Sequence, residues 1–162
     1  MAKNKEEKTN VMRVLEQKKI AYTAHTYPHE EGMAVDGVTV AKSMGFDPAI
    51  VFKTLVARGA SKQYYVFDVP VAENLDLKKA AKAVGEKSIE MIHQKELLPL
   101  TGYVHGGCSP VGMKKLFPTV FHSSAENLAA MIVSAGKIGY QVELAPHDLA
   151  ALVRAKFADI IV

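Results

Sequence analysis

A single lysine interrupts the apolar stretch at residues 50–56, and its position marks a candidate site of chemistry. Most of the apolar residues around Lys53 are β-branched or aromatic, which favours a buried strand. A buried ammonium costs free energy unless it finds a partner or points into a cleft. Lys53 therefore either reaches solvent from a half-exposed edge strand, or forms a cationic anchor on the floor of a pocket. Such a pocket would hold an anionic or carbonyl-bearing ligand.

A second candidate is the glycine-rich stretch at residues 101–112, Thr-Gly-Tyr-Val-His-Gly-Gly-Cys-Ser-Pro-Val-Gly. Four glycines and one proline in these residues predict an irregular loop whose backbone approaches something closely. Its N–H groups could bind a carbonyl or an anion, as backbone nests do. Many surface loops are equally rich in glycine, so the pattern also fits a loop without a ligand.

Other nucleophiles and metal ligands are weakly supported. His25 and His29 stand four residues apart, but Pro28 lies between them and the flanks predict strand and loop, which disfavours a shared metal. Cys108 could be a nucleophile, although no neighbouring base is apparent, so a small buried thiol is the simpler interpretation. It is the single cysteine, which excludes an internal disulfide. We find no Walker loop, dinucleotide fingerprint or nucleophile elbow, and predict neither metal nor cofactor.

The elements that must position these residues alternate irregularly. The Lys53 strand and a second strand at residues 64–69 are joined by a short glycine-containing turn, which predicts an antiparallel hairpin. Three helices are predicted from their caps: one after Thr9, one at 77–84 after Asp76, and one from Asp148 to residue 155. A fourth helix is predicted at 38–44, and a helical turn at 94–98 is expected to stop at Pro99. Further strands are predicted at 20–27, 88–92, 119–122, 129–134, 140–144 and 158–162.

Seven or eight short strands with four or five helices do not follow the regular rhythm of a doubly wound sheet. We predict an α/β (α+β) fold: a mixed, mainly antiparallel, barrel-like sheet surrounded by helices, in one domain over residues 1–162. The sequence has no signal-like apolar segment and no long apolar run, so we expect a cytoplasmic protein without a membrane span.

The charge balance is mildly basic. A net charge of +3 is compatible with contact to a nucleic-acid backbone but does not by itself argue for it. Lys78, Lys79 and Lys82 gather on one face of a predicted helix. That face is either simply solvated or in contact with phosphates.

Seven short motifs carry a resemblance that runs from about residue 10 to about residue 160. They are His25-Thr26-Tyr27, Phe52-Lys53-Thr54-Leu55, Leu75-Asp76-Leu77-Lys78-Lys79, Thr101-Gly102-Tyr103, Gly106-Gly107-Cys108-Ser109-Pro110, Val133-Ser134-Ala135-Gly136 and Lys156-Phe157-Ala158-Asp159-Ile160. With these motifs the sequence resembles the YbaK family, free-standing bacterial Cys-tRNA(Pro) deacylases related to the editing domain of prolyl-tRNA synthetases.

The resemblance implies a barrel-like α/β fold and removal of cysteine from mischarged Cys-tRNA(Pro), and by extension from Cys-tRNA(Cys). By carry-over, Lys53 is the key catalytic lysine, and the substrate-binding residues are Tyr27, Gly106, Gly107, Pro110, Ser134 and Gly136. The family's reaction is thought to use the substrate's own thiol, which attacks the ester carbonyl without a protein base or cofactor. The implied partners are tRNA and, transiently, prolyl-tRNA synthetase, with no role for DNA.

Two residues depart from the family pattern. Gln141 replaces a residue that is often acidic, which puts the amino-acid selectivity in question, and Cys108 replaces an often aliphatic residue. Two alternatives therefore stay open: a deacylase for another small amino acid, such as alanine on tRNA(Pro), and a non-catalytic module that binds tRNA or a synthetase.

Overall fold

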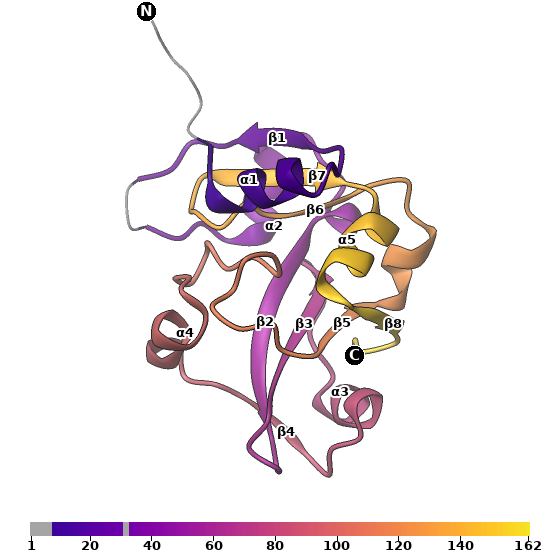
Figure 1. Cartoon of the computed structure of the whole chain (residues 1–162). Coiled ribbons are helices and arrows are strands. Elements are labelled where there is room, and N and C mark those ends of the chain that lie inside the picture. The colour runs from indigo at the N-terminus through magenta and orange to yellow at the C-terminus, as the bar shows by residue number, and fades with distance from the viewer. Residues whose placement is uncertain (1–7, 31–32) are drawn as a thin grey trace, which may run out of the picture.

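Two β-sheets adjoin where the Lys53 strand begins (Figure 1). The computed structural model describes residues 8–30 and 33–162. One antiparallel sheet has the order β1-β7-β6, comprising β1 (Thr23–Thr26), β7 (Tyr140–Leu144) and β6 (Met131–Ser134). The other has the order β4-β2-β3-β5-β8, comprising β4 (Ile89–Met91), β2 (Phe52–Gly59), β3 (Tyr64–Pro70), β5 (Thr119–His122) and β8 (Lys156–Ala158). A parallel bridge between Val51 and Ile132 links the two sheets.

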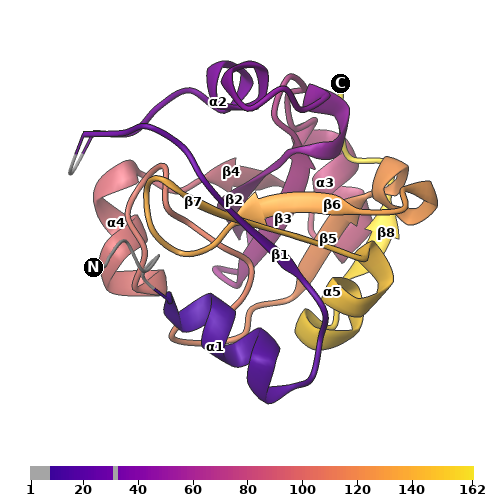
Figure 2. The same cartoon turned by 90° about the horizontal axis from the view of Figure 1, so that it is seen from above.

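The pairing confirms the mixed, mainly antiparallel sheet predicted from the sequence. β2 pairs antiparallel with β3 and β4, whereas β3 pairs parallel with β5, and β5 with β8. The barrel-like arrangement is not closed, because the strands form two sheets rather than one continuous ring. Seen from above, the smaller sheet crosses over the larger one, with α1 and α2 on opposite sides (Figure 2).

Helices surround the sheets, and local caps explain where several begin. The helices are α1 (Asn10–Gln17), α2 (Gly37–Ser43), α3 (Leu77–Val84), α4 (Gln94–Thr101) and α5 (Pro146–Val153), with short 3₁₀ turns at Pro48–Ile50 and Ser123–Asn127. Thr9 caps α1 by accepting a hydrogen bond from the Met12 amide. Asp76 caps α3 by accepting from the Lys78 and Lys79 amides, as the sequence predicted.

The β2–β3 hairpin separates two parts of the core. Its register pairs Lys53 with Val69 and Thr54 with Asp68. Successive side chains of a strand point to opposite faces. One face carries Phe52, Val56 and Val66 into the main core, which also includes α1 and Cys108. The other face carries Ala57, Phe67 and Val69 against Ala80 and Ala81 of α3. Thr54 and Asp68 therefore belong to the first face, and Lys53 to the second.

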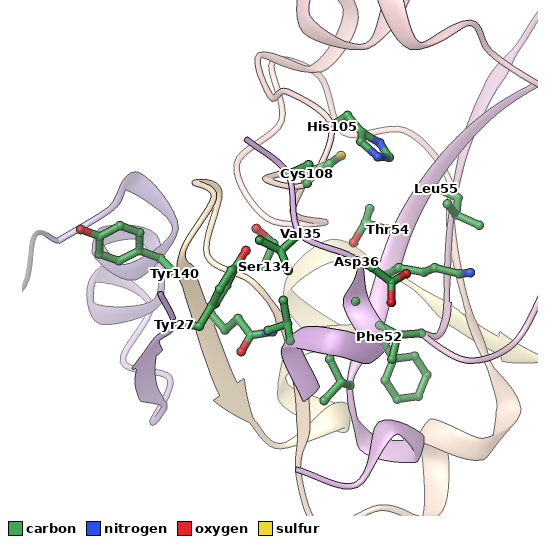
Figure 3. Close-up of a pocket in the computed structure, with 18 of the residues that line it drawn as sticks. Tyr27, Val35, Asp36, Phe52, Thr54, Leu55, His105, Cys108, Ser134 and Tyr140 are labelled. Carbon is green, nitrogen blue, oxygen red and sulfur yellow. The ribbon is translucent and has the colours of Figure 1, made fainter. Parts of the chain in front are cut away.

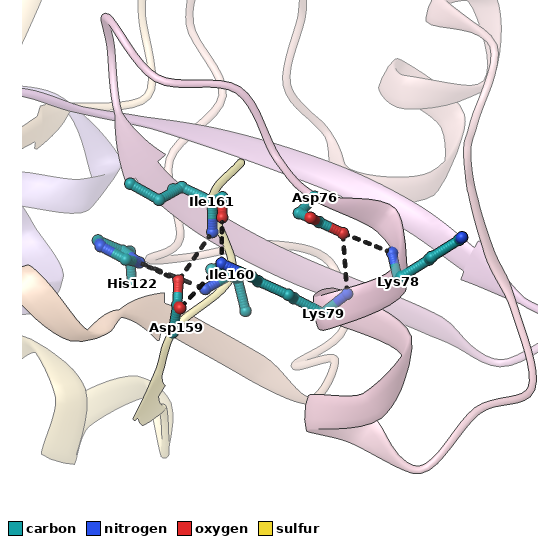
Figure 4. Close-up of polar contacts among 7 residues, drawn as sticks. All are labelled: Asp76, Lys78, Lys79, His122, Asp159, Ile160 and Ile161. Atoms are coloured by element: carbon teal, nitrogen blue, oxygen red, sulfur yellow. Dashed lines mark hydrogen bonds and ion pairs between the residues drawn. The ribbon is translucent and has the colours of Figure 1, made fainter.

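The C-terminal segment is held against α3 by a small polar network (Figure 4). Lys79 Nζ donates to Asp159 Oδ2 and to the Ile161 carbonyl, each at 2.9 Å. His122 Nδ1 accepts from the Ile160 amide at 3.3 Å, and burial lowers the pKa of this histidine. The Lys79 ammonium is thus bound within the protein, whereas the neighbouring residues Lys78 and Lys82 are exposed.

Several element boundaries differ from the predictions; the Lys53 strand, predicted at residues 50–56, runs from Phe52 to Gly59. Pro99 does not stop α4 but lies inside it: the helix continues to Thr101, whose Oγ1 donates to the Leu97 carbonyl, and Gly102 is its C-cap. Asp148 is not the cap of α5; it lies in the first turn, and Pro146 begins the helix with its fixed φ.

The first strand is shorter than predicted, covering only Thr23–Thr26. The last strand lies earlier, at Lys156–Ala158, because that segment pairs with β5, and Ile161 makes only an isolated bridge to Leu75.

Candidate active site

A cavity of about 550 Å³ opens between the small sheet, the start of β2, α2 and the glycine-rich loop (Figure 3). Four of the predicted site residues line it: Tyr27, Lys53, Gly106 and Ser134. Gly107, Pro110 and Gly136 do not line it, although each lies within three residues of one that does. The structure thus brings together residues from four segments far apart in the sequence.

Lys53 borders this cavity from a strand that is only partly covered. β3 pairs with β2 along its whole length, whereas β4 pairs with Ala57–Gly59 alone. Thr54 and Leu55 lie on opposite sides of β2 in Figure 3. Lys53 shares the side of Leu55, because residues two apart on a strand point the same way. Within residues 8–30 and 33–162, its half-buried side chain has no hydrogen bond or ion pair, and its role stays a prediction.

Tyr27 and Ser134 form the wall on the side of the small sheet. The Tyr27 side chain is buried, and its amide donates to the Gly139 carbonyl at 2.9 Å. Ser134 Oγ accepts from the Gly136 amide at 3.1 Å. Gly136 has φ +92°, and a Cβ there would lie 2.9 Å from Tyr103 Cε1. Gly136 therefore shapes the turn that orients Ser134 instead of facing the cavity.

The glycine-rich loop approaches its neighbours as closely as the sequence suggested. A Cβ on Gly106 would lie 2.7 Å from Ala34 Cβ, and one on Gly107 would lie 3.1 Å from the Ile138 amide nitrogen. The Gly107 amide donates to the Val104 carbonyl at 2.9 Å, so it is occupied within the loop. Of the two amides expected to orient a substrate carbonyl, only that of Gly106 is without an internal partner in the part of the chain that the structure describes. Pro110, in the same loop, is buried.

A fully buried carboxyl lies behind Thr54, and sequence reasoning missed it. Thr54 Oγ1, which lines the cavity, donates to Asp68 Oδ1 at 2.5 Å. Burial raises the pKa of Asp68 to about 7. Asp68 carries the same sequence signal as Lys53, which is an ionisable residue within an apolar strand. That signal alone could have marked Asp68 as a candidate functional residue.

Cys108 lines the cavity as a protonated thiol. Burial, together with the nearby charge of Asp68, raises its pKa to about 12. A thiol with that pKa is almost entirely protonated at neutral pH, and only the thiolate is a strong nucleophile. The structure therefore supports the interpretation of Cys108 as a small buried residue.

Gln141 also lines the cavity, and its side chain is only 7% exposed. Its Oε1 atom has no hydrogen-bond partner among the described residues. On β1, His25 Nε2 lies 2.7 Å from Glu143 Oε1 of β7, and in the segment after β1, His29 Nδ1 lies 2.9 Å from the Tyr27 carbonyl. The described residues contain no cluster of three or more side chains suited to a metal ion. None of the described helices has the length and apolar character required to cross a membrane.

Comparisons with known proteins agree with this geometry. Residues 29–152 match the aminoacyl-tRNA editing domain. A protein of Enterococcus faecalis, EbsC, named as a proposed Cys-tRNA(Pro)/Cys-tRNA(Cys) deacylase, is 46% identical over 161 residues, covering 99% of this chain and 98% of that protein.

Two solved structures share the fold. A proposed trans-editing enzyme for prolyl-tRNA synthetase superposes with a TM-score of 0.79 at 24% identity over 94% of both chains. A protein described only as hypothetical superposes with a TM-score of 0.82 at 18% identity, over 94% of this chain and 99% of its own. The match of the domain over most of the chain, together with the close relative, shows that the chain belongs to the aminoacyl-tRNA editing domain family.

Proposed function

We propose that this protein is a trans-editing deacylase that removes cysteine from mischarged Cys-tRNA(Pro), and also from Cys-tRNA(Cys). The observation that carries the proposal is the 46% identity to EbsC along nearly the whole of both chains. A second observation supports the proposal: Tyr27, Lys53, Gly106 and Ser134, which the resemblance to the YbaK family implies as site residues, all line one cavity. The chain acts as a single domain over residues 1–162, and we propose that it works in the cytoplasm, where its tRNA substrate occurs.

The cavity suits the chemistry of an aminoacyl ester. Its volume of about 550 Å³ lies within the range of small-molecule sites. The ester is already activated, so the site has to position the aminoacyl group and polarise its carbonyl more than supply a strong nucleophile. The protonated state of Cys108 fits a site in which the protein provides no nucleophile.

In the substrate-assisted route, the thiol of the bound cysteine attacks its own ester carbonyl. The sulfur bonds to the carbonyl carbon, the bond from that carbon to the ribose oxygen breaks, and the thiol proton ends on the ribose hydroxyl. The product is a cyclic thiolactone and a free tRNA end. We assign Lys53 to hold the oxygen-rich end of the substrate and the Gly106 amide to orient the carbonyl, with Tyr27 and Ser134 enclosing the aminoacyl group.

The partners follow from the reaction. tRNA is the substrate, and its phosphates meet a chain with a net charge of only +3, which favours weak binding by the protein alone. We propose that a transient complex with prolyl-tRNA synthetase supplies the missing tRNA selectivity. Gly107, Pro110 and Gly136 support the site by holding its loops in place.

The proposal is tested by measuring deacylation of Cys-tRNA(Pro) with the wild type, Lys53→Ala and Lys95→Ala. Lys95 is an exposed lysine of α4 outside the cavity, so its loss controls for a change in overall charge. We expect Lys53→Ala to lower the rate on the order of 100-fold or more, as loss of one electrostatic group in an active site usually does. Lys95→Ala should behave like the wild type.

Two side substrates distinguish the open alternatives. Ala-tRNA(Pro) and Ser-tRNA lack the thiol, so the substrate-assisted route predicts that neither is deacylated above background. Equal loss of alanine would instead indicate a water-based deacylase with broader selectivity. Binding of tRNA without cleavage of any ester would indicate a non-catalytic module.

A further inference from the structure

Asp68 is a fully buried carboxyl behind the cavity wall, and half of it has no partner. The side chain of Asp68 is 0% exposed, and its Oδ1 accepts the hydroxyl of Thr54. Its Oδ2 has no hydrogen-bond partner within residues 8–30 and 33–162. A buried acceptor without a partner is unfavourable for folding and calls for a functional explanation.

The bond to Asp68 fixes what Thr54 can offer to a ligand. A threonine hydroxyl has one proton to donate and two lone pairs to accept with. Because the proton is directed to Asp68, Thr54 Oγ1 faces the cavity only as an acceptor. Gln141 Oε1 is a second buried acceptor at the same cavity without a partner among the described residues.

This excess of acceptors needs a ligand group that only donates. In an aminoacyl ester, the carbonyl and ribose oxygens require donors, whereas the α-ammonium is a cation with three N–H donors and no acceptor. A charge-assisted hydrogen bond to an ionised group is roughly twice as strong as a neutral one. When Asp68 is ionised, its negative charge behind Thr54 strengthens the attraction of this wall for a cation, and a bound cation in turn favours the ionised carboxylate.

The two faces of β2 therefore offer opposite chemistry. Thr54 and Asp68 lie on one face, and Lys53 leaves the strand on the other. An aminoacyl ester has the same polarity, with a cationic amino end and an oxygen-rich ribose end. Cys108, which lies close enough to Asp68 to be affected by its charge, is a neutral thiol and makes no hydrogen bond to Oδ2.

We propose that Thr54 binds the α-ammonium of the aminoacyl group and that Asp68 is the positioning residue that holds Thr54 in its accepting orientation. This inference rests on the proposed function, which supplies the aminoacyl ester. Its consequence is selectivity for a free amino group. N-acylated substrates, which include peptidyl-tRNA, lose the cation and two of the three donors and are bound poorly.

The test compares Cys-tRNA(Pro) with N-acetyl-Cys-tRNA(Pro) in steady-state kinetics. For the wild type we expect acetylation to raise KM about tenfold or more, the usual value of a hydrogen bond to a charged group. Asp68→Asn keeps an acceptor for Thr54 but removes the charge, and Thr54→Val removes the hydroxyl. Both should raise KM for the free-amine substrate and bring the ratio of the two KM values, acetylated to free, towards one. The change in kcat should be smaller.

Two further variants separate this role from a general effect on the fold. Thr54→Ser retains the hydroxyl and should restore the discrimination. Thr119→Val removes another buried hydroxyl, which donates to the Phe117 carbonyl at 2.8 Å. Thr119 does not line the cavity, so this substitution should leave the discrimination unchanged. Wild-type discrimination in Asp68→Asn and Thr54→Val, or its absence in the wild type, would overturn the proposal.

A binding measurement makes the result independent of catalysis. Cysteinyl-adenosine with a 3′-amide in place of the ester, and its N-acetyl derivative, are titrated against each variant by calorimetry. A preference for the free amine that depends on Asp68 supports binding of the α-ammonium by Thr54, even if Cys-tRNA(Pro) is not deacylated. In that case only the proposed function fails. Equal affinities of the wild type for the two analogues would contradict binding of the α-ammonium by Thr54, whatever the deacylation assay shows.

Discussion

Burial of Asp68 couples the stability of this fold to pH. The carboxyl is fully buried, and burial raises its pKa from 3.8 to about 7, against the smaller effect of the Thr54 hydrogen bond, which lowers it. The folded state therefore holds this proton more tightly than the unfolded state does. Between about pH 4 and pH 7 the unfolded carboxyl ionises and the folded one does not, so the free energy of unfolding falls as the pH rises.

Replacing Asp68 with asparagine should remove this dependence. At pH 7.5 we expect Asp68→Asn to be more stable than the wild type by up to about 4 kcal/mol, the free energy that corresponds to a pKa shift of this size. At pH 4 the two proteins should be similar, because the wild-type carboxyl is then protonated in the folded state. Urea denaturation at both pH values measures the difference, and an equal difference at pH 4 and pH 7.5 would contradict the explanation.

Single residues show how far sequence reasoning could reach at this scale. Lys53 was identified because one charge in an apolar strand is conspicuous, and the structure places it at the cavity. Asp68 carries the same signal in the next strand, but its importance depends on the cross-strand pairing with Thr54, which local sequence does not reveal. The unpaired state of Gln141 Oε1 depends in the same way on what surrounds it in three dimensions.

At the scale of elements, local chemistry predicted some boundaries well and others badly. The helix from Leu77 to Val84 was predicted correctly because Asp76 and Gly85 define its two ends through their own backbone contacts. The strand at the C-terminus was misplaced because its position is decided by pairing with β5, a distant segment. The Pro99 prediction was wrong because Leu97 packs into the main core, and this tertiary packing holds the helix through to Thr101 despite the loss of one amide donor.

The glycine-rich loop gives a prediction about an element as a unit. Gly106 has φ +89°, and a Cβ there would collide with Ala34, so Gly106→Ala must displace either the loop or the segment before α2. Both segments line the cavity, and we expect deacylation of Cys-tRNA(Pro) to fall at least tenfold, because misplacement of about 1 Å commonly costs more than that.

Gly85→Ala is the matched control for that substitution. Gly85 also has a positive φ, of +74°, but a Cβ there meets nothing within 4 Å. Both variants therefore carry the backbone strain of roughly 1–2 kcal/mol that alanine has in this conformation, and only Gly106→Ala carries the collision. The deacylation rate and the thermal midpoint are measured for each; an equal loss of activity in the two variants would show that strain, and not the shape of the cavity, is responsible.

At the scale of the whole molecule, the site exists because the two sheets adjoin. Tyr27 and Ser134 come from the small sheet, Lys53 and Thr54 from the large one, and the Gly106 loop closes the gap between them. Each segment could be predicted separately, and the resemblance to a known family indicated that they meet. Hydrophobic patterns alone could not place them together, because the bridge between Val51 and Ile132 joins residues far apart in the sequence.

The net charge of the molecule leads to a prediction about tRNA binding. A net charge of +3 gives only a weak overall attraction for phosphates, and Lys79 is already engaged with Asp159. If about two phosphates are neutralised, affinity should fall only about tenfold between 50 mM and 200 mM salt, compared with 10³-fold or more for an extended nucleic-acid interface. We therefore expect KM for Cys-tRNA(Pro) to rise by about that factor over this range.

Adding prolyl-tRNA synthetase should then lower KM at 200 mM salt without changing kcat, because the synthetase contributes tRNA contacts and takes no part in the ester cleavage. A synthetase for an unrelated amino acid is the control and should have no effect. A salt dependence of 10³-fold or more by this chain alone would show an extended phosphate interface of its own. Lys78→Glu and Lys82→Glu, which reverse two exposed charges on α3, would then show whether that interface includes this helix.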